Sequence, residues 1–206
     1  MSIDSNPTTI GLVIAGILAP LIYAVTVVVG AAIRPGYSHF GNAISELVES
    51  NAPHRAGLNV AFFGYNICSM AFGIGITTLA PNPTIVLSGW ILVLTGLFGV
   101  GMSWLPMDPI GSPATRPGRG HLVVAGLMSV GSMAAILAFA IGCGKIDGWS
   151  SFSAYSYATF AVVLVTGGVA ALSARGHWRA MGLLERLTIG AFLQWHAVLA
   201  IALLTR

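Results

Sequence analysis

The chain has 206 residues, of which 56% are hydrophobic and 7% are charged, and its formal net charge is +3. A soluble domain carries roughly 25% charged residues, so this chain has too few charges to cover a surface in water and is expected to lie in a membrane. The small net charge and the lack of a basic amphipathic segment exclude nucleic-acid binding. At about 20 residues per crossing, the length allows six crossings with short loops.

Six apolar runs give the predicted transmembrane helices. The first, over 10–33, contains Pro20, which a membrane helix tolerates when its neighbours satisfy the freed carbonyl. In the polar connection 34–57, Asn42 is expected to cap a short interfacial helix. The other helices are predicted at 58–79, 84–105, 121–143, 152–172 and 183–203. We therefore predict an all-α polytopic integral membrane protein, a six-transmembrane-helix bundle with a single membrane domain over 1–206.

Charge is distributed unequally between the two sides of this predicted bundle. With six crossings, loops 34–57, 106–120 and 173–182 share one side, and both termini share the other. The loops on the first side and the helix ends next to them hold seven of the nine basic residues and four of the six acids: Arg34, Arg55, Arg116, Arg119, Arg175, Arg179 and Arg186, with Glu46, Glu49, Asp108 and Glu185. The other side has Lys145, Arg206, Asp4 and Asp147.

Positively charged loops tend to stay in the cytoplasm. The charge distribution therefore predicts a multi-pass protein of the cell membrane with these three loops cytoplasmic and both termini outside. An alternative stays open at this point. If the arginines bind an anion, their distribution reflects that chemistry and does not report the orientation.

Three ionisable residues on the charged side are candidate catalytic groups. Asp108 ends the third run and His121 opens the fourth only thirteen positions later, so antiparallel neighbouring helices would bring their side chains together. An Asp–His pair can fix the imidazole tautomer and raise its basicity, which suits acid–base catalysis. The same pair could instead be a structural salt bridge. Glu46, from the first loop, is expected to join them as a second carboxylate.

Five further residues are candidates for binding a substrate. Ser45 precedes Glu46, and Arg119 and Arg186 would anchor an anionic head group. Asn59 and His196 lie inside predicted helices, where polar side chains usually face the bundle interior and either hold helices together or serve function. A neutral His196 that is hydrogen-bonded to a neighbouring helix would serve equally well in packing.

The sequence assigns no metal and no cofactor. An HExxH motif is absent, and the histidines have no paired ligand spacing on one helix. A metal held by His39, Asp108 and His121 from separate loops remains an alternative. Neither a phosphate-binding loop nor a dinucleotide-binding motif follows a predicted strand. Cys68 and Cys143 lie in or at the end of apolar runs and are expected to be small buried hydrophobic residues.

Four segments together resemble a known family. They read NAISELVES, APHRAGLNVAFFGYNI, WLPMDPIGSPATRPGRGH and GLLERLTIGAFLQW, and they are similar to the bacterial and archaeal membrane family catalogued as domain of unknown function nine-nine-eight. The most specific matches are Ile44-Ser45-Glu46, Pro106-Met107-Asp108 and His121. Members tend to have an aromatic residue where this chain has Leu105. The resemblance implies six transmembrane helices with shared polar motifs on one face, and no agreed activity.

Three functions fit these observations. The first is an enzyme that uses acid–base chemistry on a lipid or isoprenoid at the membrane surface, with a hydrophobic or anionic-headed small molecule as its substrate. The second is an accessory or assembly subunit whose polar face contacts another membrane protein. The third is a transporter, which needs a polar path through the bilayer. Its candidates at depth are only Asn59, Asn66, Gln194 and His196.

Overall fold

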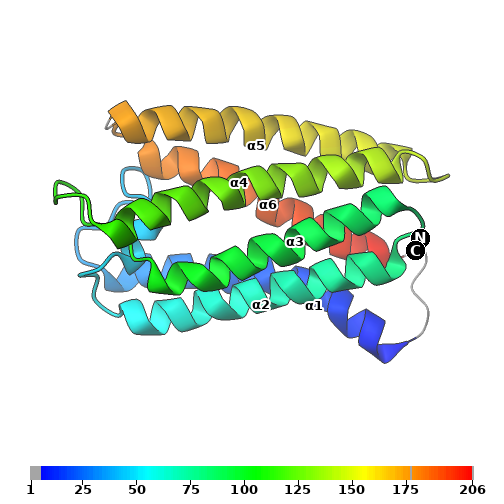
Figure 1. Ribbon diagram of the computed structural model, residues 1–206, viewed down its shortest axis with the longest axis horizontal. Helices are drawn as coiled ribbons and strands as arrows, with labels where there is room; N and C mark the ends of the chain where they lie inside the picture. Colours follow the sequence, from blue (N-terminus) through cyan, green and yellow to red (C-terminus); the bar gives the residue numbers. More distant parts are fainter. Residues whose placement is uncertain (1–5, 177, 206) are drawn as a thin grey trace.

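The computed structural model describes residues 6–176 and 178–205, so Asp4, His177 and Arg206 of the sequence lie outside the described residues. Six long helices run along one axis (Figure 1). Each is long and apolar enough to cross a membrane, and the described residues form no strand. The predicted all-α six-helix membrane bundle is therefore confirmed. The helices are α1 (Pro7–Ile33), α2 (Arg55–Leu79), α3 (Pro83–Gly101), α4 (Arg116–Cys143), α5 (Ser150–Gly176) and α6 (Met181–Leu204), with short 3₁₀ helices η1 (Ile44–Val48) and η2 (Met102–Trp104).

Polar caps make three of the helices begin earlier than the apolar runs indicate. Asn6, Asn82 and Thr115 each accept a hydrogen bond from a backbone N–H in the first turn, at 3.0, 3.1 and 3.1 Å. A proline occupies the first or second position of each of these helices, where its missing N–H costs no hydrogen bond. As a result α4 begins at residue 116, five positions before the predicted start at 121.

The six helices form a ring in which each packs against its neighbours in the chain, and α1 and α6 close the ring. Helices α4 and α5 lie close together near the loop that joins them and separate toward their other ends (Figure 1). In agreement, α4 is mostly buried over 131–143, whereas only Gly118 and His121 are buried over 116–130. The bundle is therefore more tightly packed near the α4–α5 loop than at the opposite end.

An aromatic cluster forms the centre of the tightly packed part. The Phe139 ring lies 6.1 Å from Trp149, 5.7 Å from Phe152 and 5.8 Å from Trp195 between centroids, all edge-on. The indole N–H of Trp195 donates to the Ser156 hydroxyl at 3.0 Å. This satisfied polar contact lets a large ring lie fully buried in the core.

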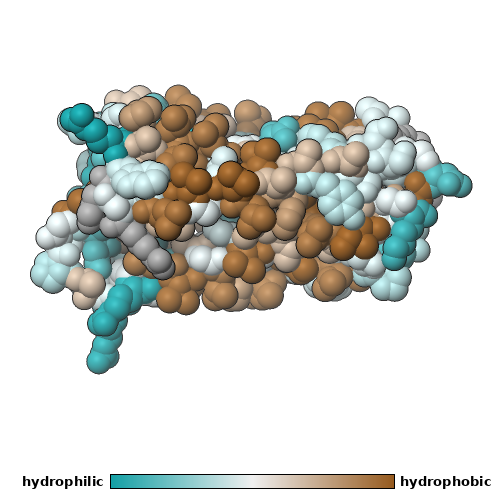
Figure 2. Space-filling view, turned by 90° about the horizontal axis from the view of Figure 1, so that it is seen from above, coloured by the Kyte–Doolittle hydropathy of each residue, from teal (hydrophilic) through white to brown (hydrophobic). Residues whose placement is uncertain are grey.

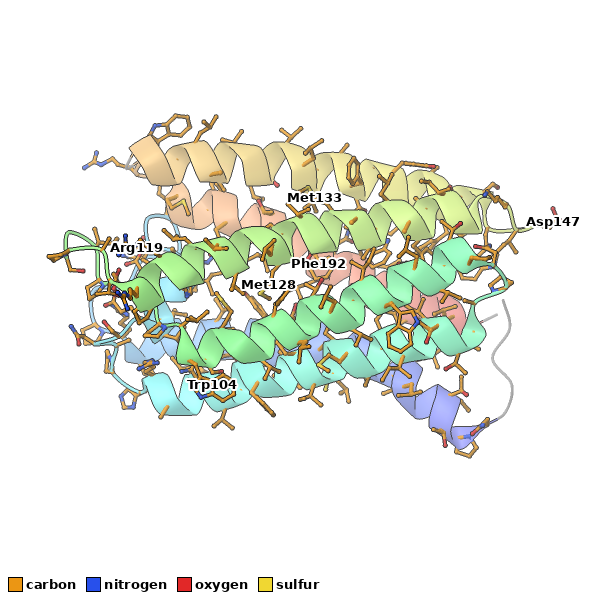
Figure 3. All side chains as sticks on the ribbon, in the orientation of Figure 1. Trp104, Arg119, Met128, Met133, Asp147 and Phe192 are labelled. Carbon is orange, nitrogen blue, oxygen red and sulfur yellow. The ribbon has the colours of Figure 1, made fainter. Side chains whose placement is uncertain are left out.

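Hydrophobic side chains surround the middle of the bundle, and hydrophilic ones gather at its two ends (Figure 2). We call the end with the loops 34–54 and 102–115 the charged end. Trp104 and Arg119 lie there, whereas Asp147 lies at the opposite end (Figure 3). Both described termini lie at that opposite end as well (Figure 1). The loops that the sequence assigns to one side therefore do share one end of the bundle.

Candidate functional site

At the charged end, the loop 34–54 is seated on the start of α6. The carbonyl of Phe40 accepts a hydrogen bond from the Leu183 N–H at 3.0 Å. The Glu185 carboxylate accepts the Ile44 N–H at 2.6 Å, and it thereby satisfies a donor at the start of η1 that the short helix cannot satisfy itself. A side chain at Gly182 would collide with the Asn42 carbonyl. The loop and the helix therefore form one unit.

Arg186 is the centre of this unit. Its Nε donates to His39 Nδ1 at 3.2 Å, and its Nη1 donates to the carbonyls of Asn42 and Gly182 at 2.9 and 2.8 Å. Its Nη2 donates to the Tyr37 hydroxyl at 2.6 Å. All four acceptors are neutral groups. Among the residues that the structure describes, the only ion pair within 4.0 Å is Arg34–Glu49, so no contacting carboxylate neutralises the Arg186 guanidinium.

The hydrogen bonds of this network fix the donor and acceptor roles of Tyr37 and the tautomer of His39. Tyr37 accepts from Arg186 and donates to the Ala43 carbonyl at 2.9 Å. Burial raises the pKa of the Tyr37 phenol above its usual value, although the nearby Arg186 opposes the shift. Because Arg186 Nε donates to Nδ1 of His39, the neutral imidazole carries its proton on Nε2. His39 is exposed at the surface and can present this N–H to a ligand.

Glu46 has a structural role within the same loop. Its carboxylate accepts the Ala43 N–H and the Asn42 side-chain amide, both at 2.7 Å. Asn42 was expected to cap a helix beginning beside it, and this expectation is wrong in detail. The helix is a 3₁₀ turn that begins at Ile44, and Ala43 is its N-cap. Arg34 donates to the Glu46 carbonyl and to the Glu49 carboxylate, the latter at 2.6 Å, which ties the end of α1 to η1.

Asp108 organises the connection between α3 and α4. Its carboxylate accepts the Thr115 hydroxyl at 2.6 Å and the Thr115 N–H at 2.8 Å. These two bonds lower the pKa of the Asp108 carboxyl below its usual value. A side chain at Gly118 would overlap this carboxylate. Asp108 therefore fixes the first turn of α4, and the residue type at 118 is limited by its presence.

His121 is held by the backbone and not by Asp108. Its Nδ1 lies 2.8 Å from the Leu105 carbonyl. A carbonyl only accepts, so Nδ1 carries the proton and the neutral ring has Nε2 as a basic nitrogen. The side chain is 6% exposed. Asp108 acts on His121 electrostatically, but the structure gives no hydrogen bond between them, so Leu105 sets the tautomer that we expected Asp108 to set.

The predicted catalytic residues thus share the charged end but belong to two separate hydrogen-bonded groups. Glu46 belongs to the loop 34–54 and α6, whereas Asp108 and His121 belong to the α3–α4 connection. Met107 joins the two groups, because its carbonyl accepts the Ser50 N–H at 3.1 Å and its sulfur lies 3.0 Å from the Ser45 hydroxyl. Ser45, a predicted substrate-binding residue, is therefore engaged in this junction.

The other predicted substrate-binding residues are spread over the bundle. Arg119 is exposed and its Nε donates to the Thr115 carbonyl at 3.4 Å. Asn59 is half-buried on the second turn of α2. His196 is fully buried, and neither ring nitrogen has a hydrogen-bond partner. Its ring packs edge-on against Phe72 at 5.1 Å. The hydrogen bond to a neighbouring helix, which was one of the two alternatives for His196, is thus absent.

A groove between α1 and α6 lies beside the Arg186 network. Its volume is about 250 Å³, and it is lined by Tyr23, Ala24, Val27, Val28, His39, Ile44, Arg186, Ile189, Gly190 and Leu193. Ala24, Val28 and Gly190 are exposed on the outer surface of the bundle. The groove therefore faces the surrounding lipid, with apolar walls along the helices and Arg186 and His39 at its charged end. None of Glu46, Asp108 and His121 lines it.

Sequence reasoning did not single out Tyr37 or Tyr23, and it named Glu185 only among the acids of the charged side. The roles of Tyr37 and Glu185 depend on the path of loop 34–54 over α6, which brings together residues more than 140 positions apart. Nothing in the local sequence indicates that path. Within the described part of the chain, no three His, Cys, Asp or Glu side chains lie close enough to hold a metal ion. His39, Asp108 and His121 are therefore not brought together as a ligand set.

Comparison with known families agrees with this architecture. The family model described as "Protein of unknown function (DUF998)" matches residues 17–202. The chain belongs to this family. The matched range covers α2 to α5 completely and includes the parts of α1 and α6 that line the groove, so the resemblance noted in the sequence is confirmed. No curated protein and no solved structure matches this DUF998 chain.

Proposed function

We propose that this DUF998 protein binds a membrane lipid in the groove between α1 and α6, with the lipid's polar head at Arg186 and His39. The observation that carries the proposal is the groove itself, which joins an apolar wall open to the bilayer with a polar group at the charged end. Binding sites for small molecules commonly combine a mostly apolar lining with a few placed polar groups. The acyl or isoprenoid chain of a lipid matches the apolar walls of the groove, and the polar head of the lipid matches the charged end with Arg186 and His39.

The depth of the groove suits a lipid of one leaflet. Arg186 and Leu193 are its first and last lining residues on α6, and seven residues of helix rise about 10 Å. Half of the hydrocarbon core measures about 15 Å. A chain that enters beside Arg186 would therefore lie along the groove within the leaflet next to the charged end.

Filling the groove tests this function. Nothing lies within 4 Å of a Cβ atom added at Gly190, which lines the groove, or at Gly168, which is exposed on α5. The Gly190→Leu variant should lose most of the lipid that co-purifies with the protein, as measured by native mass spectrometry. The matched Gly168→Leu variant should retain it. Equal lipid retention in both variants would show that the groove is not the site.

Acid–base catalysis at His121 is a second candidate. The observation that favours it is the fixed tautomer, because the Leu105 carbonyl holds the proton on Nδ1 and leaves Nε2 as a base. Helix α4, which carries His121, is three places from α1 in the ring, so this chemistry would act at a site other than the groove. The Nε2 atom of His121 would accept a proton from a lipid head at the membrane surface.

Lipid turnover tests the catalytic candidate. The protein in vesicles of a total bacterial lipid extract would be compared with its His121→Gln variant, and the lipids would be analysed by mass spectrometry over time. Catalysis predicts a lipid species that accumulates only with the unsubstituted protein. Identical lipid profiles for the two folded proteins would refute catalysis at His121, while the proposed lipid binding would stand.

We also propose that the protein lies in the cell membrane with its charged end in the cytoplasm. The excess of basic residues near that end supports this orientation, and Arg116, Arg119 and Arg179 are exposed there. Cysteine substitutions at Ser112, in the charged-end loop, and at Asp147, at the opposite end, provide the test. In intact cells, a membrane-impermeant maleimide should label only the cysteine at 147.

A further inference from the structure

We infer that the lipid held in the α1–α6 groove carries an anionic head group, a carboxylate or a phosphate. The inference rests on the proposed lipid-binding function and adds the chemical class of the ligand. It follows from the kind of polar group that faces the groove and from the charge of Arg186.

The polar side chains at the charged end of the groove, His39 and Arg186, supply hydrogen-bond donors, and no carboxylate is among the lining residues. His39 has its proton on Nε2, because Nδ1 accepts from Arg186. Arg186 uses four of its five N–H groups in the network, which leaves one on Nη2. A head group with several acceptor oxygens and no obligatory donor matches this set.

The charge of Arg186 points in the same direction. The guanidinium is half-buried at the membrane surface, and its acceptors are an imidazole, two carbonyls and a phenol. These groups orient the guanidinium without neutralising it. Glu46 and Glu185 lie nearby, but each carboxylate accepts backbone N–H bonds of loop 34–54. A half-buried cation gains most from an anion in direct contact, and the groove gives an anion access to it.

The network also explains how the site is kept in place without ligand. The carbonyls of Asn42 and Gly182 hold Nη1 and the Tyr37 hydroxyl holds Nη2, and the centre of the guanidinium lies 5.6 Å from the Tyr37 ring centroid. The side chain therefore loses little freedom when a head group arrives. Such preorganisation raises affinity because the ordering has already taken place.

Photolabelling with lipids that differ only in their heads tests the inference. Three probes with the same diazirine-bearing 16-carbon chain would be used on the protein in phosphatidylcholine nanodiscs: a fatty acid, a lysophosphatidic acid and an uncharged monoacylglycerol. Labelled peptides would be mapped by mass spectrometry to 23–28 and 189–193. The anionic probes should label these segments about tenfold more than the uncharged one, the effect of one charge-assisted hydrogen bond.

Two variants separate recognition of the head from folding. Arg186→Gln should abolish the preference for anionic probes, but it also loosens loop 34–54. His39→Phe changes an exposed residue at the groove mouth that accepts one of the four hydrogen bonds of Arg186, and it should reduce the preference while the protein stays folded. Preference for the fatty acid alone would identify a carboxylate, and preference for lysophosphatidic acid alone would identify a phosphate. Either supports the inference.

The remaining outcomes overturn it. If all three probes label the groove equally, or the uncharged probe labels it more, the head is not recognised as an anion, although lipid binding stands. If no probe labels the two segments and Gly190→Leu changes nothing, the proposed function fails together with the inference.

Discussion

The crossing of α2 and α3 offers a quantitative test of the packing. At Gly73, an added Cβ would lie 2.7 Å from the Gly89 carbonyl oxygen and 3.1 Å from the Val93 nitrogen. Both are backbone atoms, so neither can rotate away. To restore an ordinary contact of about 3.4 Å or more, the helices must separate by roughly 0.7 Å over a tightly packed interface, and overpacking of this kind costs about 1–3 kcal/mol.

Gly64 provides the matched control. It lies on the same helix, and an added Cβ there meets nothing within 4 Å. Alanine favours a helix over glycine by up to about 1 kcal/mol, and both substitutions share this gain. Gly73→Ala should therefore be less stable than Gly64→Ala by about 1–3 kcal/mol. The free energy of unfolding would be measured by SDS titration of the protein in detergent micelles. Equal stability of the two variants would refute the close approach of α2 and α3.

Substitutions at three other positions test the charged end. Glu185→Ala removes the acceptor of the Ile44 N–H and should lower the free energy of unfolding by about 1–3 kcal/mol. Glu185→Gln keeps a carbonyl oxygen and should lower it less. Equal losses in the two variants would contradict the role of that hydrogen bond. The folded-state pKa of Asp108 is depressed by Thr115, so its contribution to stability is present above about pH 4 and is lost as the pH falls through the folded pKa. The difference in thermal unfolding between Asp108→Asn and the unsubstituted protein should then be present at pH 6 and shrink as the pH falls below about 4. A difference that does not change with pH would refute this. His54 has a left-handed backbone with φ of +59°, so His54→Gly should raise the unfolding free energy by about 0.5–1 kcal/mol, whereas a loss of stability would show that this conformation carries no strain.

The helices and their sidedness could be predicted because composition and local pattern determine them. Long apolar runs give the six crossings, and the number of crossings places the three charged loops at one end. The earlier helix starts could also have been predicted, because Asn6-Pro7 and Asn82-Pro83 each combine an N-cap residue with a proline at the first helical position. Asp108 and His121 were correctly expected at one end, because they flank a single short loop.

The groove and the Arg186 network could not be predicted in the same way. They depend on α1 meeting α6 and on loop 34–54 crossing to Glu185, and sequence spacing does not determine contacts between elements so far apart. His196 shows a second reason. Its position on a helical face was consistent with a hydrogen bond, but aromatic neighbours such as Phe72 and Phe192 occupy the space around it. Only the packed structure reveals which neighbours a buried residue has.

The closure of the ring by its first and last helices affects how the protein is made. The ribosome synthesises about 150 residues between the end of α1 at Ile33 and the start of α6 at Met181, which takes roughly 7–30 s. During that interval α1 lacks the partner helix that completes its outer wall. A newly made chain therefore forms the Arg186 site of the groove only in the final stage of insertion. A lipid bound in the groove would indicate that α6 has packed against α1 and the bundle is complete.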